Sequence, residues 1–186
     1  MLSTRLNLQS TSQRRAVTIG TLLAVVGLAV ILAWALVLPN LVHATHGVPH
    51  GMILARGSFA EATDVKIKST LGGESRVMNV KDSAQVIVQN VTVEPGAQTG
   101  WHSHHGPVVV VVAAGTMTLY QADDPSCTGE TFTAGEAFVD PGQGNVHNAR
   151  NDGTVGVSLY ATYFDVPVNA TSPAIPAANP GTCSGF

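Results

Sequence analysis

Two histidines, His102 and His104, are separated by one residue, and a third, His147, follows well downstream. In a β-strand the side chains at positions i and i+2 point to the same face, so the first two imidazoles can grip one metal ion. A third imidazole from a second strand would complete a site that binds a first-row divalent ion and leaves positions open for water, substrate or dioxygen. The alternative is that the three histidines are the polar lining of an empty pocket.

Other residues near the three histidines have less definite roles. His105 has the opposite parity from His102 and His104, so we expect it at the rim or the surface and not as a ligand. Glu136 and Asp140 are acids close to His147 in the sequence, but the spacing does not fix the face on which either lies. Four aromatic residues either line the pocket or fill the core, and core filling is the simpler interpretation: Trp101, Tyr120, Tyr160 and Tyr163.

The elements that must position these residues are short strands. From Ser58 onward, runs of β-branched and apolar residues alternate with clusters of Gly, Pro, Asn and Asp. Five consecutive valines, 108–112, predict a strand covered on both faces. Many short strands with regular turns predict an all-β sandwich or barrel. The predicted strands are 62–68, 85–93, 108–112, 116–120, 130–133, 137–139, 146–150 and 155–164.

The two histidine segments resemble the two sequence motifs of the cupin superfamily over about residues 80–165. The first motif is matched by Gly96, His102, His104 and Gly115, with Val108 in the position of its glutamate. The second is matched by Gly135, Pro141, Gly144, His147 and Asn151, with one extra residue between Pro141 and Gly144. The resemblance implies a single jelly-roll barrel of two sheets, with His102, His104 and His147 as metal ligands.

The missing motif glutamate has chemical consequences. Without a carboxylate the ion keeps its full positive charge, so it should polarise a bound oxygen more strongly and bind less tightly. Some cupin dioxygenases that act on thiols or β-diketones use a three-histidine iron site, and the resemblance implies that Fe(II)-dependent oxygenation of a small organic substrate is open to this chain. Fe, Mn, Zn and Ni remain candidates for the ion. The alternative function is a non-catalytic metal- or ligand-binding or sensing module, because this fold hosts many activities.

An apolar run precedes the β-rich part. Residues 16–38 carry no charged side chain and are about long enough to cross a bilayer, and Arg14 and Arg15 come directly before them. We therefore expect a transmembrane helix with the following domain outside the cytoplasm. The alternative is a cleaved signal peptide, with Val42 and Ala44 at positions suited to cleavage, which would give a secreted protein.

The expected organisation has five parts. They are a cytoplasmic N-terminus (1–15), a membrane anchor (16–38), a stalk (39–56), the β-barrel domain (57–168) and an extended tail (169–186). His43, His46 and His50 fall in the stalk, and Gly and Pro between them argue against a helical metal site. Cys127 and Cys183 either form a disulfide that fixes the tail, which requires an oxidising compartment, or are two free thiols.

Composition excludes one class of partner. The 186 residues have a net charge of −3, and only 11% are charged. Binding to a phosphate backbone requires a row of Lys and Arg, so we do not expect a nucleic-acid partner. The expected partners are a small-molecule ligand or substrate and, through the N-terminal segment, the membrane. The sequence leaves a homodimer open.

Overall fold

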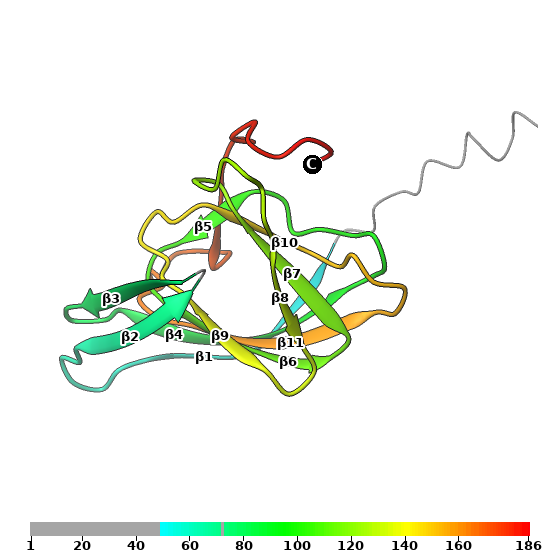
Figure 1. Ribbon diagram of the computed structural model, residues 1–186. Coiled ribbons are helices and arrows are strands. Elements are labelled where there is room, and N and C mark those ends of the chain that lie inside the picture. The colour runs from blue at the N-terminus through cyan, green and yellow to red at the C-terminus, as the bar shows by residue number, and fades with distance from the viewer. Residues whose placement is uncertain (1–48, 72) are drawn as a thin grey trace, which may run out of the picture. The chain divides into compact units, whose positions relative to one another are not determined.

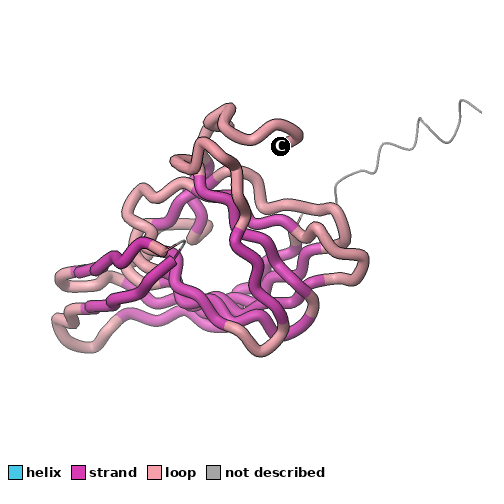
Figure 2. The backbone as a smooth tube through the Cα atoms, in the orientation of Figure 1, coloured by secondary structure: helices cyan, strands magenta, loops and turns pink. Residues whose placement is uncertain are grey.

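The structure is a computed structural model that describes residues 49–71 and 73–186. These residues form strands and no helix (Figure 2). The strands are β1 (His50–Ser58), β2 (Val65–Leu71), β3 (Glu74–Val80), β4 (Gln85–Val93), β5 (His102–His104), β6 (Val108–Ala114), β7 (Thr116–Gln121), β8 (Glu130–Thr133), β9 (Ala137–Asp140), β10 (His147–Arg150), β11 (Val157–Tyr163) and β12 (Ala174–Pro176).

Two five-stranded sheets form the walls of the domain (Figure 1). One has the order β1-β4-β11-β6-β9 and the other β12-β5-β10-β7-β8, and neighbouring strands are antiparallel in both. Strands β2 and β3 pair only with each other, in a hairpin at the side of the barrel. The predicted all-β fold with a double-sheet barrel is therefore confirmed.

The predicted ranges cover eight of the twelve strands in the described part of the chain; β5 was expected only as the strand of the His102/His104 pair, and three strands were missed altogether. Two predicted ranges, 85–93 and 130–133, coincide with β4 and β8. The first missed strand, β1, begins at His50, within the range 39–56 that was expected to be a stalk. Every residue of β1 is exposed. An exposed strand has no alternation of apolar and polar residues, so the pattern could not reveal it. Strand β3 was also missed, and β12 is too short to show any period.

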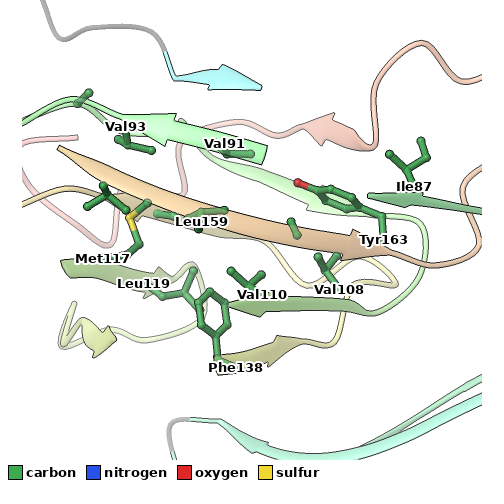
Figure 3. Close-up of a cluster of buried hydrophobic side chains, with 14 of the residues drawn as sticks. Ile87, Val91, Val93, Val108, Val110, Met117, Leu119, Phe138, Leu159 and Tyr163 are labelled. Atoms are coloured by element: carbon green, nitrogen blue, oxygen red, sulfur yellow. The ribbon is translucent and has the colours of Figure 1, made fainter. Parts of the chain in front are cut away.

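The core lies between the two sheets and is built from alternating side chains (Figure 3). In β6, Val108, Val110 and Val112 are buried, whereas Val111 is 43% exposed. The prediction that this valine run is covered on both faces is therefore wrong, because only one face of β6 meets the opposite sheet. Each buried valine contributes roughly 1.5 to 3 kcal/mol relative to an exposed one, which fixes the register of β6 strongly.

The C-terminal tail is attached to the barrel in two ways. Strand β12 pairs with β5, the strand that carries the first two histidines. A disulfide joins Cys127 to Cys183, which closes a loop with a sequence separation of 56 residues. The tail thus supplies an edge strand to the sheet that carries the histidines.

Residues 49–71 and 73–186 contain no helix that is long and apolar enough to cross a membrane. The predicted transmembrane segment, 16–38, belongs to the part of the chain that the structure does not describe. His43 and His46 belong to that part as well, while His50 is exposed in β1.

Candidate metal centre

The three predicted ligands come together on one sheet. His102 and His104 lie on β5 and His147 lies on the neighbouring strand β10, where it pairs with His102. One nitrogen from each imidazole lies within 4.8 Å of the corresponding nitrogens of the other two. Ligands that share one ion at about 2.1 Å lie about 3 to 4 Å apart, so a small side-chain rotation suffices to place all three on an ion.

Backbone carbonyl groups orient the two imidazoles of β5. Nδ1 of His102 lies 2.8 Å from the carbonyl oxygen of Gly100, and Nδ1 of His104 lies 3.0 Å from that of Pro173. When Nδ1 donates to a carbonyl, the proton is on Nδ1 and the lone pair is on Nε2. Ligating histidines typically make such a hydrogen bond with their second nitrogen, so both rings have the arrangement of metal ligands.

The third imidazole has an unsatisfied atom. His147 is 4% exposed, and its buried Nδ1 makes no well-aligned hydrogen bond among the described residues, although Oδ1 of Asp140 lies 3.3 Å from it. A buried polar atom without a partner costs about 1 to 3 kcal/mol, so such an atom calls for an explanation. A cation in the space between the three rings would interact favourably with this part of the site. The residues present therefore fit a divalent metal ion.

Burial also sets the charge of the imidazoles. Loss of solvation lowers the pKa of His102, and it lowers the pKa of His104 and of His147 to about 3. Neighbouring histidines lower the pKa values of His104 and His147 further, because two positive charges at this separation would repel each other. All three rings are thus neutral at neutral pH, which is the state that binds a metal ion.

A tight loop before β10 places His147. Gly142, Gln143 and Gly144 have φ values of 59°, 53° and 88°, and the amide of Asn145 donates to the carbonyl of Gly142. A Cβ atom on Gly142 would lie 1.9 Å from the carbonyl oxygen of Gly106, so only glycine fits there. The extra residue that the sequence shows between Pro141 and Gly144 is accommodated in this left-handed turn, and His147 still reaches the site.

The structure resolves the faces of the two nearby acids. Asp140 is 1% exposed; its Oδ1 lies 3.3 Å from Nδ1 of His147 and its Oδ2 lies 3.9 Å from Nε2 of His104. Burial raises the pKa of this carboxyl group. Glu136 is exposed, and its carboxylate accepts hydrogen bonds from the backbone and hydroxyl groups of Thr133. Asp140 therefore belongs to the site and Glu136 does not.

A pocket of about 770 Å³ reaches the cluster at His102, and His105, Trp101 and Tyr163 are among the other residues that line it. The buried ring of Tyr163 lies 5.1 Å from the ring of His104. Burial and, next, the charge of Asp140 raise the pKa of the Tyr163 phenol, so it stays protonated at neutral pH.

The remaining candidates lie apart from the three-histidine cluster. His105 lines the pocket but is not one of the three clustered histidines, in agreement with the expectation of a rim position. Tyr120 donates a hydrogen bond to Asp152, and Tyr160 is 46% exposed. Asn151, the last residue of the second motif, is fully buried and donates to the carbonyl groups of Val93 and Val155. Its role in this structure is to hold the turn after β10.

The structure is thus a two-sheet β-barrel with a cluster of three imidazoles that could hold a metal ion. Residues 89–163 match the family model described as "Cupin domain", and all three histidines fall within the match. Residues 89–163 therefore match a cupin domain, in line with the resemblance of the two motifs.

Comparison with solved structures gives distant similarities. A conserved protein with a double-stranded β-helix domain from Klebsiella pneumoniae is 19% identical over 71% of this chain and 83% of its own, with a TM-score of 0.45. A cupin 2 conserved barrel domain protein from Salinispora arenicola is 25% identical over 44% of this chain and 64% of its own, with a TM-score of 0.38. The polyketide cyclase RemF from Streptomyces resistomycificus is 19% identical over 51% of this chain and 64% of its own, with a TM-score of 0.41. No protein in the curated set matches the sequence.

Proposed function

We propose that the cupin domain binds one divalent metal ion through His102, His104 and His147 and that it is a metal-dependent oxygenase of a small organic substrate. The observation that carries the proposal is the convergence of three neutral imidazoles, of which His104 and His147 are buried and His102 lines a pocket of about 770 Å³. Three protein nitrogens leave coordination positions open on a first-row ion, and a redox-active ion such as Fe(II) supplies dioxygen chemistry at such positions when bound.

The protein residues around the site would hold the substrate and control its protons. Tyr163 lines the pocket, and its raised pKa keeps the phenol protonated, so it can donate a hydrogen bond to a polar atom of a substrate. Trp101 contributes an apolar wall to the same pocket. Polar side chains such as Gln89, Thr99 and Asn169 line the same pocket, so it suits a small molecule that has both apolar and polar parts.

We also propose that the domain is extracytoplasmic and anchored by residues 16–38. The uncharged run after Arg14 and Arg15 supports this orientation, and the disulfide between Cys127 and Cys183 supports an oxidising compartment. If the N-terminal segment is cleaved, the same domain would be secreted.

The test begins with metal content. The purified protein should contain about one metal ion per chain, and His147→Ala should lose most of it, because removal of one of three ligands leaves too few to hold the ion. Elemental analysis measures both. Full metal occupancy of the His147→Ala protein would contradict the assignment.

Oxygen consumption by the metal-loaded protein, screened over small organic substrates that include thiols and β-diketones, then tests the activity. Turnover that is lost in His147→Ala supports the oxygenase. A protein that holds its metal and binds small ligands in the pocket, yet consumes no oxygen with any of them, would be a binding module instead.

A further inference from the structure

A buried acid, Asp140 of β9, lies beside Val108 of β6, the residue that occupies the place of the missing motif glutamate. Val108, which occupies the glutamate position, pairs directly with Asp140 of β9, and the two are each 1% exposed. Directly paired residues of an antiparallel sheet point to the same face. Val108 also pairs with Tyr163 of β11, the neighbouring strand on the side away from β9. The ring of Tyr163 contacts the ring of His104. Val108 and Asp140 therefore both face the side of the sheet that holds the site.

We propose that Asp140 supplies the carboxylate ligand from β9 that the first motif lacks on β6. The proposal rests on the proposed three-histidine metal site. Two ligand atoms that each lie about 2.1 Å from one ion are about 3.0 Å apart when the ligand–ion–ligand angle is a right angle and about 3.4 Å apart when it is tetrahedral. Their separation cannot exceed about 4.2 Å, which is reached when they lie on opposite sides of the ion. Oδ1 of Asp140 lies 3.3 Å from Nδ1 of His147, and Oδ2 lies 3.9 Å from Nε2 of His104, so both distances fall within that range.

The surroundings of Asp140 leave room for a ligand role. Oδ1 accepts a hydrogen bond from the side chain of Asn145, and Oδ2 accepts one from the amide of Gly142. Each carboxylate oxygen has two lone pairs, so each retains one.

The charge of Asp140 is also uncompensated by basic side chains. Within the described residues, no Lys or Arg forms a salt bridge with Asp140, and Arg76 reaches it only through a hydrogen bond to Asn145. A buried carboxylate without a cation is costly, and a divalent ion between it and the three imidazoles would remove that cost.

The competing explanation is that Asp140 only orients His147 through Nδ1, as outer-shell carboxylates commonly do. The two roles predict different responses to a carboxylate moved to the neighbouring strand. A glutamate at position 108 would lie beside position 140 and could restore a metal ligand there, but it would not reproduce a hydrogen bond that Nδ1 of His147 donates to Asp140. Asparagine at position 140 removes the charge yet keeps an acceptor oxygen for His147.

The experiment compares the binding of Mn²⁺ and Zn²⁺ to full-length wild type, Asp140→Asn and Asp140→Asn/Val108→Glu by calorimetric titration of the metal-free proteins. Loss of a residue that only orients a ligand typically weakens metal binding about 10- to 100-fold, and Asp140→Asn should weaken Mn²⁺ binding by more than this. The loss of Zn²⁺ affinity should be smaller than the loss of Mn²⁺ affinity, because Mn²⁺ prefers carboxylate ligands and Zn²⁺ binds well to imidazole. Adding Val108→Glu should recover most of the lost Mn²⁺ affinity.

A matched control tests whether recovery depends on where the new glutamate lies or only on the added negative charge. Val109 points away from the core, so Asp140→Asn/Val109→Glu has the same net charge with the carboxylate on the wrong face, and it should not recover binding. Loss of affinity that Val108→Glu fails to restore would overturn the ligand role in favour of orientation of His147. Unchanged affinity in Asp140→Asn would overturn any role in binding while leaving the three-histidine site intact. A wild type that binds neither ion would instead overturn the proposed function itself.

Discussion

At the scale of single residues, burial decides the chemical state of the site. His102, His104 and His147 lie on the inner wall of the barrel, where loss of solvation disfavours the imidazolium form. The same burial that keeps the rings neutral for a metal ion makes the metal-free domain sensitive to acid. In the unfolded chain these histidines bind protons near their ordinary pKa of 6.5, but in the folded domain His104 and His147 do so only near 3.

The metal-free domain should therefore become less stable as the pH falls from about 6.5 towards 3. In this window the unfolded state binds more protons than the folded state, and each such histidine removes up to about 1.4 kcal/mol of unfolding free energy per pH unit. The pKa of Asp140 is raised in the folded domain, so above its ordinary value of 3.8 this residue makes the domain more stable as the pH falls. It is one group, whereas three histidines act in the other direction.

Urea unfolding at about pH 7 and about pH 5 measures this difference. The variant His104→Gln/His147→Gln should show a smaller change between the two values, since glutamine does not titrate. Equal pH dependence in the variant and the wild type would show that other groups dominate.

At the scale of elements, the C-terminal tail belongs to the site. Strand β12 pairs with β5 and so extends the sheet that carries two of the histidines. The carbonyl of Pro173, directly before β12, accepts the Nδ1 hydrogen of His104. Phe186 at the end of the chain packs at 5.7 Å from the ring of Trp101, which lines the pocket. A segment without any predicted ligand thus orients one ligand and supports the pocket wall.

Deletion of residues 172–186 should weaken metal binding although it removes no histidine. The truncated chain loses the partner of His104 and the strand beside β5, so we expect a loss of roughly 10- to 100-fold in affinity, as for other residues that orient ligands. Titration with Zn²⁺ measures it, in a chain that also carries Cys127→Ser to avoid a free thiol.

The matched control is the full-length Cys127→Ser/Cys183→Ser protein, which keeps β12 and the carbonyl of Pro173. It should lose about 4 kcal/mol of stability in the chain-entropy model but bind zinc nearly as well as the wild type. If the two proteins bind zinc equally, β12 does not position His104.

At the scale of the whole molecule, one covalent bond bears on where the domain works. The disulfide closes a long loop and fixes the tail to the barrel, and such bonds persist in oxidising compartments. Arg14 and Arg15 before the apolar run 16–38 favour the orientation that puts the domain in such a compartment. Two independent features thus support the same proposed location.

Protease added to intact cells, with any outer envelope breached, should cut residues of the β-domain and spare residues 1–15. Immunoblotting with tags at each end of the chain distinguishes the two regions. A protected β-domain, with Cys127 and Cys183 free in peptide mapping of the exported protein, would reverse the proposed orientation.

The sequence by itself determined the class of fold and the three histidines. Short alternating runs specify strands because the side-chain period of a strand is two, and the His102/His104 spacing has that period. Exposed or very short strands carry no such period, so β1 and β12 went unrecognised. Strand β3 was missed as well, although Met78 and Val80 near its end are buried. The Cys127–Cys183 pair was left as one of two alternatives, because two cysteines far apart in sequence do not state their distance in space.

Only the tertiary structure shows where Asp140 and Pro173 lie relative to the histidines. The sequence places Asp140 next to Pro141 and its Gly-rich turn, where strand parity is lost, so its face could not be fixed until the pairing of β9 with β6 set it opposite Val108. The contact of Pro173 with His104 joins segments 69 residues apart, and no local pattern encodes it. Both depend on long-range pairing of strands, which arises from the packing of the whole barrel and not from the preferences of neighbouring residues.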